Sequence, residues 1–374
     1  MRDNLCAEAG YVSLKKEGEA LSGDRVEVFG DSESLVLVLA DGLGTGVKAS
    51  ILSTLTAKIL GTMIAGGMPL HECVDAVART LPEGGDGAYS TFTAIEIREE
   101  GEARLIQFDN PAVVALRGGE IREYPRERRE IAGRVILESR FPCREGDVFV
   151  ALSDGAVNAG GARWRTAETS ALIKGLYRPG ISAKALSASV AEVVGGLCEG
   201  LFSDDATVAA VRLRARAMAS VAFGPPANPE QDAAMMNLFF GKAGAKIVCG
   251  GTTAMIAARR LSTGVVPLEG APGDSVPPMS EIRGVDLVTE GVLTFARALE
   301  YVERVPGGGQ PRDIFAGRDG AARLARELVE SATDIHFLVG RGGAAATGVL
   351  RERLVQSMAA CLEKMGKRVV VSWF

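Results

Sequence analysis

The sequence predicts an α+β protein with two domains, and three observations predict it. Short apolar runs bounded by Gly, Pro, Asn and Asp follow one another through the first 216 residues, which is typical of strands in a layered sheet. The helical segments among them come in pairs, which favours separate layers over a repeating βαβ unit. Three prolines between residues 225 and 229 remove backbone donors and disfavour helix. We therefore expect one domain over residues 1–216, a linker over 217–230 and a smaller α/β domain over 231–374.

Strands and helices can be assigned in order along the first domain. Each expected strand is a short run rich in apolar, β-branched or aromatic residues. These runs are residues 26–29, 35–40, 91–97, 103–108, 113–116, 134–138, 147–152 and 207–213. Each expected helix repeats its apolar residues at helical spacing, as Ile51, Leu55 and Ile59 do. The expected helices are residues 47–65, 70–80, 167–175 and 182–198.

Strands and helices alternate in the second domain. A strand is expected at 246–249, followed by a helix at 252–261. Residues 284–299 are expected to form a helix, which would place Asp286 and Glu290 on one face. The remaining elements are a strand at 334–339, a glycine-rich turn, a helix that ends at residue 364 and a strand at 368–373. This alternation predicts a sheet that is at least partly parallel.

Composition excludes several classes of function. The net charge of −5 argues against a nucleic-acid-binding protein, which needs a basic face. Two histidines argue against catalysis by a histidine cluster, and six cysteines without a C-x-x-C pair argue against a zinc or thioredoxin-like motif. The first ten residues lack the apolar core of a signal peptide, and the apolar stretch at 59–70 is shorter than the ~20 residues that span a bilayer. We expect a cytoplasmic protein with neither nucleic-acid nor membrane partners.

Acidic residues stand where strands begin or end. Asp24 precedes the strand at 26–29, and Asp41 ends the strand at 35–40. Asp154 ends the strand at 147–152, and Asp204 and Asp205 precede the strand at 207–213. If the edges of two sheets meet, these carboxylates gather in one place.

Gathered carboxylates require cations. Like charges ~4 Å apart repel by roughly 4 kcal/mol at an effective dielectric constant of about 20. Oxygen ligands without His or Cys suit Mg²⁺ or Mn²⁺. Two such ions can share a water, lower its pKa and neutralise a phosphate ester. Gly42 and Gly155 allow sharp turns beside the ions, and a main-chain carbonyl there can be a further ligand.

The combined pattern resembles the PPM family of metal-dependent serine/threonine phosphatases, in the bacterial branch typified by the stage II sporulation protein E. The resemblance rests on Ser22-Gly-Asp24, Ala40-Asp-Gly-Leu-Gly-Thr-Gly46, Tyr89-Ser-Thr-Phe92, Leu152-Ser-Asp-Gly155 and Asp204-Asp-Ala-Thr207. It implies a fold of two packed antiparallel sheets flanked by helices, an α/β/β/α sandwich. The second α/β domain is additional to this family fold.

The resemblance also implies roles for these residues. Two Mn²⁺ or Mg²⁺ ions would be bridged by Asp41, bound by the carbonyl of Gly42 and completed by Asp154 and Asp204. Spacing alone leaves Asp204 and Asp205 open as the ligand, and the family order favours the first of the pair. Asp24 would be a further ligand or acceptor. Asp24, Asp41 and Asp154 are therefore the candidate catalytic residues.

The implied activity is hydrolysis of phosphoserine or phosphothreonine on a regulatory protein by a metal-bridging water. Family substrates are often antagonists of anti-sigma factors. The second domain resembles the tail of phosphatase-like proteins encoded near iron hydrogenases, so a hydrogenase-associated protein is another candidate partner. A second copy of the chain, forming a homodimer, is a third.

Two other interpretations stay open. The protein could be a catalytically silent phosphatase-fold scaffold that senses a ligand or partner through its C-terminal domain. Alternatively, Gly42-x-Gly44-x-Gly46 could cradle a phosphate or a dinucleotide at a helix N-terminus, but this leaves Asp154 and Asp204 unexplained.

The second domain contains a candidate anion site of its own. Gly250, Gly251, Thr252 and Thr253 follow a strand and open a helix, so backbone N–H groups and hydroxyls are available to an anion. Simple capping of the helix explains the same residues without a ligand. The turn at 340–343 is a second loop of this kind.

Overall fold

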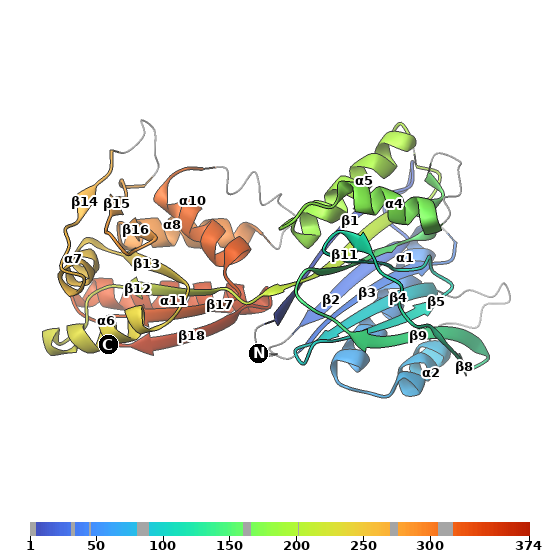
Figure 1. Cartoon of the computed structure of the whole chain (residues 1–374), viewed down its shortest axis with the longest axis horizontal. Helices are drawn as coiled ribbons and strands as arrows, with labels where there is room; N and C mark the ends of the chain where they lie inside the picture. Colours follow the sequence, from blue (N-terminus) through green and yellow to red (C-terminus); the bar gives the residue numbers. More distant parts are fainter. Residues whose placement is uncertain are drawn as a thin grey trace. The chain divides into compact units, whose positions relative to one another are not determined.

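The computed structural model describes residues 5–30, 34–44, 46–80, 90–159, 166–200, 202–269, 276–305 and 317–374 (Figure 1). The chain divides into two units, Met1–Ala215 and Arg216–Phe374.

Two antiparallel sheets form the N-terminal unit. The six-stranded sheet has the order β2 (Asp24–Gly30), β3 (Ser34–Gly42), β4 (Ser90–Arg98), β5 (Glu102–Phe108), β9 (Arg134–Pro142) and β8 (Glu127–Ile131). The five-stranded sheet has the order β1 (Leu5–Leu14), β11 (Ala206–Ala215), β10 (Asp147–Leu152), β6 (Val114–Arg117) and β7 (Glu120–Ile121).

Side chains alternate between the two faces of each strand, so the N-terminal unit has three hydrophobic cores: one between the sheets and one between each sheet and its helices. In β3, Leu37 and Leu39 join the core between the two sheets, whereas Val36 and Val38 face the helices. Helices α1 (Gly46–Ala65) and α2 (Leu70–Thr80) cover the six-stranded sheet. Helices α3 (Asp154–Val157), α4 (Thr166–Leu176) and α5 (Ala183–Leu197) cover the other. Helices α4 and α5 are labelled in Figure 1. The predicted α/β/β/α sandwich is therefore confirmed.

Helix α1 is apolar on both of its faces. Leu52, Leu60 and Ile64 are buried against the sheet, but Val47 and Ile51 are 61% and 52% exposed. Among the described residues, α1 is the one helix long and apolar enough to cross a membrane. The expectation that no segment reaches this length was wrong because it counted a shorter apolar stretch. The buried face of α1 identifies it as a core helix of this unit.

One mixed sheet forms the centre of the C-terminal unit. Its order is β14 (Val266–Pro267), β15 (Ser280–Glu281), β16 (Leu287–Thr289), β13 (Ala245–Cys249), β12 (Met218–Phe223), β17 (Asp334–Val339) and β18 (Arg368–Trp373). The strands from β16 to β18 are parallel, and β14 to β16 pair antiparallel. Helices α6 (Asp232–Gly241) and α7 (Gly251–Arg260) belong to one core. Helices α8 (Val292–Arg304), α10 (Gly320–Arg326) and α11 (Ala345–Lys364) belong to the other.

Two sequence expectations for this unit need correction. Residues 217–230 do not form a linker, because they contain β12, which lies between two parallel strands. Its run Met-Ala-Ser-Val-Ala-Phe is apolar apart from Ser220, as expected for a strand covered on both faces. The three prolines follow it in a loop, and Pro229 opens a short 3₁₀ turn.

The expected helix at 284–299 begins later, at Val292. The preceding residues form β16, which pairs with β13. Asp286 accepts a hydrogen bond from the Lys246 N–H at 2.7 Å, and Glu290 follows the strand. These two acidic residues therefore do not share a helical face.

Acid sensitivity of the C-terminal unit is predicted from His336, which is buried in β17. Its Nε2 atom lies 2.8 Å from Ser372 Oγ, and its Nδ1 atom has no hydrogen-bond partner. Burial, assisted by the charge of Lys242, lowers its pKa to about 4. The unfolded chain therefore binds the additional proton between pH 6.5 and 4, so stability is complete above pH 6.5 and falls as the pH decreases. Acidification from pH 7.5 to 5 should remove about 2 kcal/mol.

The measurement is urea unfolding followed by Trp373 fluorescence in a Trp164→Phe background. A His336→Gln variant is the matched control, because it does not titrate. The difference in unfolding free energy between pH 7.5 and pH 5 should be larger for the protein with His336 than for the His336→Gln variant. Identical pH dependence in both proteins would contradict this account.

Candidate metal centre

Two carboxylates face each other at the end of the six-stranded sheet. Asp24 in β2 is the register partner of Asp41 in β3. Asp41 lies on the same face of β3 as Leu37 and Leu39, which belong to the core between the sheets. Asp24 lies on the same face of β2 as Val26, which belongs to that core as well. Like charges directly opposite each other on neighbouring strands are destabilising. The strand pattern therefore places two mutually repelling groups at the edge of the inter-sheet core.

The five-stranded sheet brings the other carboxylates to this edge. Thr207 donates its N–H to Ser153 Oγ at 2.9 Å, and Ser153 donates its own to Thr207 O at 3.0 Å. This pair fixes the end of β10 against the start of β11. A side chain at Gly155 would overlap the carbonyl oxygen of Asp205, so glycine is required for the two loops to meet. Asp154 is consequently held beside the Asp204–Asp205 pair.

The carboxylates perturb one another strongly. Asp24 is 6% exposed, and neither of its carboxylate oxygens has a hydrogen-bond partner. Burial raises its pKa to about 7, the charges of Asp205 and Asp154 add to the shift, and the nearby hydroxyls of Thr207 and Ser153 offset part of it. Burial also raises the pKa of Asp41 to about 9, reinforced by Asp24, Asp154 and Asp204. The residues that the sequence predicts to converge therefore lie within electrostatic reach of each other.

Lys and Arg leave this group of five carboxylates without an ion pair in the part of the chain that the structure describes. Burial also raises the pKa of Asp204, which the charges of Asp154 and Asp205 reinforce; Lys16 offers only a partial opposing charge. Uncompensated carboxylates in a partly buried position are a common arrangement for binding a cation.

Asp204 and Asp205 have different partners. Asp205 accepts hydrogen bonds from the N–H of Lys16 at 3.0 Å through Oδ1 and of Gly23 at 2.6 Å through Oδ2. It therefore holds the segment that leads to Asp24. Asp204 accepts from the N–H of Asp205 through Oδ1, and its side chain is exposed. Asp204 is thus the member of the pair with a free oxygen, whereas Asp205 positions the loops.

Gly42 is fixed by close packing. Its N–H donates to Gly23 O at 3.1 Å, and a side chain here would overlap the carbonyl oxygen of Ala49 in α1. The Gly42 carbonyl oxygen would lie 3.6 Å from a Cβ atom on Gly23, and Asp205 Oδ2 would lie 3.2 Å from the same atom. The Gly42 carbonyl therefore faces the loop that Asp205 holds.

The oxygen atoms of these residues are suitable ligands for a hard divalent cation, but they are not grouped closely enough to surround one. The available donors are carboxylate and carbonyl oxygens, and the Asp24 oxygens are buried without partners. However, in the described ranges no three His, Cys, Asp or Glu side chains are grouped as a ready-made metal site. Cation binding would therefore require the carboxylates to move closer together.

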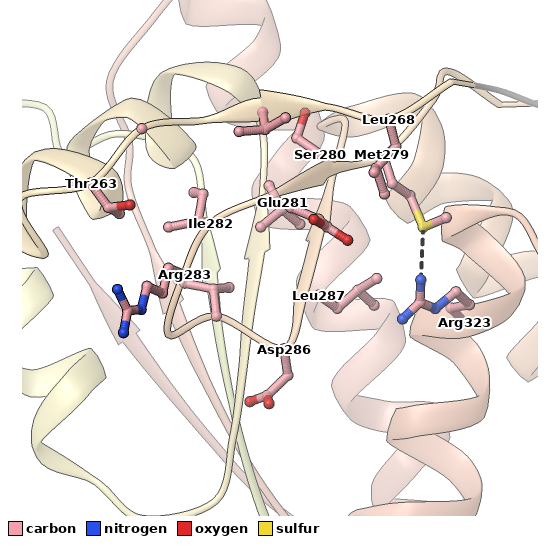
Figure 2. Close-up of a pocket in the computed structure, with 14 residues that line it drawn as sticks. Thr263, Leu268, Met279, Ser280, Glu281, Ile282, Arg283, Asp286, Leu287 and Arg323 are labelled. Atoms are coloured by element: carbon pink, nitrogen blue, oxygen red, sulfur yellow. Dashed lines mark hydrogen bonds between the residues drawn. The ribbon is translucent and has the colours of Figure 1, made fainter.

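A separate cavity lies in the C-terminal unit and contains none of these carboxylates. It has a volume of about 370 Å³ and lies beside the β14–β15 pair (Figure 2). Arg323 Nη1 lies 3.6 Å from Met279 Sδ there, the interaction drawn as a dashed line in Figure 2. Its walls combine apolar side chains with charged ones such as Glu281 and Arg283. The predicted anion loop, Gly250 to Thr253, also belongs to this unit, where it forms the start of α7.

Sequence reasoning missed two residues of the N-terminal site. Ser153 and Thr207 join the end of β10 to the start of β11 within the five-stranded sheet, and Asp205 accepts hydrogen bonds from backbone N–H groups more than 180 positions away. The motifs Leu-Ser-Asp-Gly and Asp-Asp-Ala-Thr contain them, but a hydrogen-bond partner that distant has no local signal.

Comparisons with known proteins agree with this geometry. Residues 31–214 match the model of the family described as Stage II sporulation protein E (SpoIIE). No curated protein matches the chain.

Several solved structures are similar. The PP2C phosphatase domain with a regulatory-domain fragment of SpoIIE from Bacillus subtilis has a TM-score of 0.51 and 19% identity, covering 57% of this chain and 65% of that one. The phosphatase domain of the same protein in a crystal form without domain swapping has a TM-score of 0.46 and 18% identity, with 57% and 94% covered. The RsbU and RsbW domains of Rv1364c from Mycobacterium tuberculosis have a TM-score of 0.45 and 21% identity, with 57% and 61% covered.

The family match ends at residue 214, next to the boundary of the N-terminal unit, and Asp24 precedes its start. The first of the solved structures above shares the fold of two antiparallel sheets with helices. The segment that carries Asp41, Asp154 and Asp204, residues 31–214, therefore belongs to the SpoIIE family of PPM-type phosphatases.

Proposed function

We propose that the protein is a metal-dependent phosphatase that hydrolyses phosphoserine or phosphothreonine on a regulatory protein. The observation that carries this proposal is the convergence of Asp24, Asp41, Asp154 and Asp204, from two different sheets, without a neutralising cation in the described chain. Membership of the family supports it. A regulatory phosphoprotein, of the anti-sigma antagonist or hydrogenase-associated type, is the partner we propose in a cytoplasmic setting.

The proposed mechanism gives each residue a role. Asp41, Asp154, Asp204 and the Gly42 carbonyl would hold two Mn²⁺ or Mg²⁺ ions. When bound, such ions lower the pKa of a water and neutralise charge on a phosphate ester. Asp205 orients the Asp24 segment through its backbone hydrogen bonds. Ser153 and Thr207 hold the loop that carries Asp154 against the start of β11, so that Asp154 and Asp204 stay close together.

A scaffold without activity is the second candidate. The observation that favours it is the absence of a preformed three-residue ligand group among the described side chains. A scaffold would bind divalent ions weakly and would not turn over any phosphopeptide. Asp24 distinguishes the two functions physically, since a buried carboxylate without a hydrogen-bond partner is unfavourable unless a cation compensates it.

Activity is the first test. The wild-type protein should hydrolyse p-nitrophenyl phosphate and a phosphoserine peptide with Mn²⁺ and stop with EDTA. Asp41→Asn and Asp154→Asn should each lower kcat/KM at least about 100-fold, because each removes a charge that holds the ions. Asp109→Asn is the matched control, since Asp109 is exposed and Asn tolerates its positive φ of 50°. Unchanged turnover in the first two variants would overturn the assignment.

The second test is the stability of the protein without metal. We expect two similar substitutions to change the free energy of unfolding in opposite directions. In EDTA, Asp41→Asn should raise the unfolding free energy by about 1 kcal/mol, because it removes repulsion among buried carboxylates. Asp205→Asn should lower it by about 1–2 kcal/mol, because an amide cannot accept both backbone N–H bonds.

Thermal unfolding with added Mn²⁺ completes this comparison. Mn²⁺ should raise the unfolding temperature of the wild type, and this shift should disappear in Asp41→Asn. If Asp41→Asn is instead destabilised in EDTA to the same extent as Asp205→Asn, the carboxylates do not repel one another as described.

A further inference from the structure

The strand order of the parallel sheet in the C-terminal unit reverses at its central strand, β12. The chain runs from β12 to β13 and β16 on one side, and then returns to place β17 and β18 on the other. In open parallel sheets, ligands bind outside the carboxyl ends of the strands; the switch point itself lies between β12 and β17, and β13 and β16 are the next strands on one side of it. The loops that leave these carboxyl ends contain Gly224, Gly250, Gly291 and Gly340.

Two of these loops bring two helix N-termini together. A Cβ atom on Gly291 would lie 3.5 Å from the Cα atom of Gly250, and one on Gly250 would lie 3.9 Å from the Cα atom of Gly291. Gly250 precedes α7 and Gly291 precedes α8, and no side chain caps either helix. By contrast, Asp319 caps α10 by accepting from the N–H of Ala321 and Ala322, both at 2.9 Å. The first turns of α7 and α8 thus present N–H donors side by side without a side-chain acceptor.

Each of these helices also carries a buried threonine without a partner. Thr253 and Thr294 are the third residues of α7 and α8, and both are fully buried. Neither hydroxyl oxygen has a hydrogen-bond partner. Thr253 Oγ1 lies 3.4 Å from the position of a Cβ atom on Gly250, so it points toward the start of its helix. Buried hydroxyls without partners are unfavourable, and finding two at equivalent positions indicates a missing acceptor.

A buried arginine adds positive charge to the same edge. Arg351 in α11 is 5% exposed and donates to the carbonyl oxygens of Gly340 and Gly342. Its Nε atom has no partner, and within the described residues it forms no ion pair. A side chain at Gly224 would overlap the Arg351 guanidinium, and the N–H of Gly224 lies 3.4 Å from Cys249 O, next to Gly250.

Two acidic residues near this edge, among those the structure describes, are Asp319 and Glu290. Asp319 is occupied by the two N–H groups of α10, and Gly320 beside it packs on Thr289 and Thr294. Glu290 lies between β16 and Gly291, and its side chain is exposed. Solvent and salt screen an exposed charge, whereas buried donors act at full strength. The electrostatic potential at this edge is therefore expected to favour binding of an anion.

We propose that this edge of the C-terminal unit binds the phosphate group of a small molecule. The first turns of α7 and α8 donate backbone N–H groups to its oxygens, the hydroxyl of Thr253 donates a further hydrogen bond, and Arg351 supplies positive charge. The phosphate can come from free inorganic phosphate or from a nucleotide. This site is separate from the carboxylates of the N-terminal unit, so its failure would leave the proposed phosphatase activity untouched.

Calorimetric titration of the full chain in EDTA tests the proposal, with inorganic phosphate and ADP as probes. EDTA prevents divalent ions in the N-terminal unit from binding either probe. At least one probe should bind with a Kd of about 1 mM or tighter. Tighter binding of ADP by about tenfold or more identifies a nucleotide, and equal affinity identifies free phosphate. Absence of binding by both probes at about 10 mM overturns the proposal.

Three variants locate the site. Gly291→Asp places a carboxylate at the start of α8 and should weaken binding at least about tenfold. Gly291 has φ −81° and ψ −111°, so any side chain placed there meets the same backbone constraint, and Gly291→Ala controls for it. Gly291→Ala fits the same space without charge and should retain affinity within about threefold. Thr253→Val removes only the hydroxyl and should weaken binding roughly 3- to 10-fold in a protein at least as stable as the wild type.

Wild-type affinity in both Gly291→Asp and Thr253→Val would contradict the assignment, as would equal loss in Gly291→Ala and Gly291→Asp. If Gly291→Asp does not fold, Thr253→Val decides, because the replacement has the same shape and leaves the backbone donors in place.

Discussion

Repulsion among carboxylates at the junction of two sheets is the constraint on which the N-terminal unit depends. Asp24 and Asp41 are paired across neighbouring strands, and Asp154 and Asp204 reach them from the opposite sheet. The core between the sheets excludes water on one side, which makes the unpaired charges more costly. Two sets of hydrogen bonds hold the carboxylates in place. The Ser153–Thr207 pair fixes the Asp154 loop within its own sheet, and the Asp205 carboxylate accepts from the N–H groups of Lys16 and Gly23, next to Asp24. A divalent cation bound among these carboxylates would relieve their repulsion, so the arrangement favours cation binding.

The same packing connects this edge to helix α1. Gly42 touches Ala49 so closely that no side chain fits, and Gly42 is also the donor to Gly23. A displacement of α1 would therefore move Gly42 and the loop that leads to Asp24. The exposed side chains Val47 and Ile51 lie on the same helix as Ala49.

Much of the fold could be predicted from the sequence because its signals are local. The strands around 35–40 and 147–152 alternate between two cores and stop at Asp-Gly or Ser-Asp-Gly, which fixes both the strand and the position of its carboxylate. Strand β12 was missed because its apolar run is short and the prolines after it dominate the local pattern. The start of the helix expected at 284–299 was wrong for a related reason: Leu287–Thr289 is too short a run to distinguish strand from helix by its period. The partners of Asp205, and the meeting of Gly250 with Gly291, depend on tertiary contacts and have no local signal.

The most direct test is anomalous diffraction at the manganese edge from crystals of the full chain grown with MnCl₂. The account predicts two manganese peaks about 4 Å apart or less, among the oxygens of Asp41, Asp154, Asp204 and Gly42. Crystals with manganese in solution but no peak near these oxygens would contradict it, as would carboxylates that remain as far apart as without the metal.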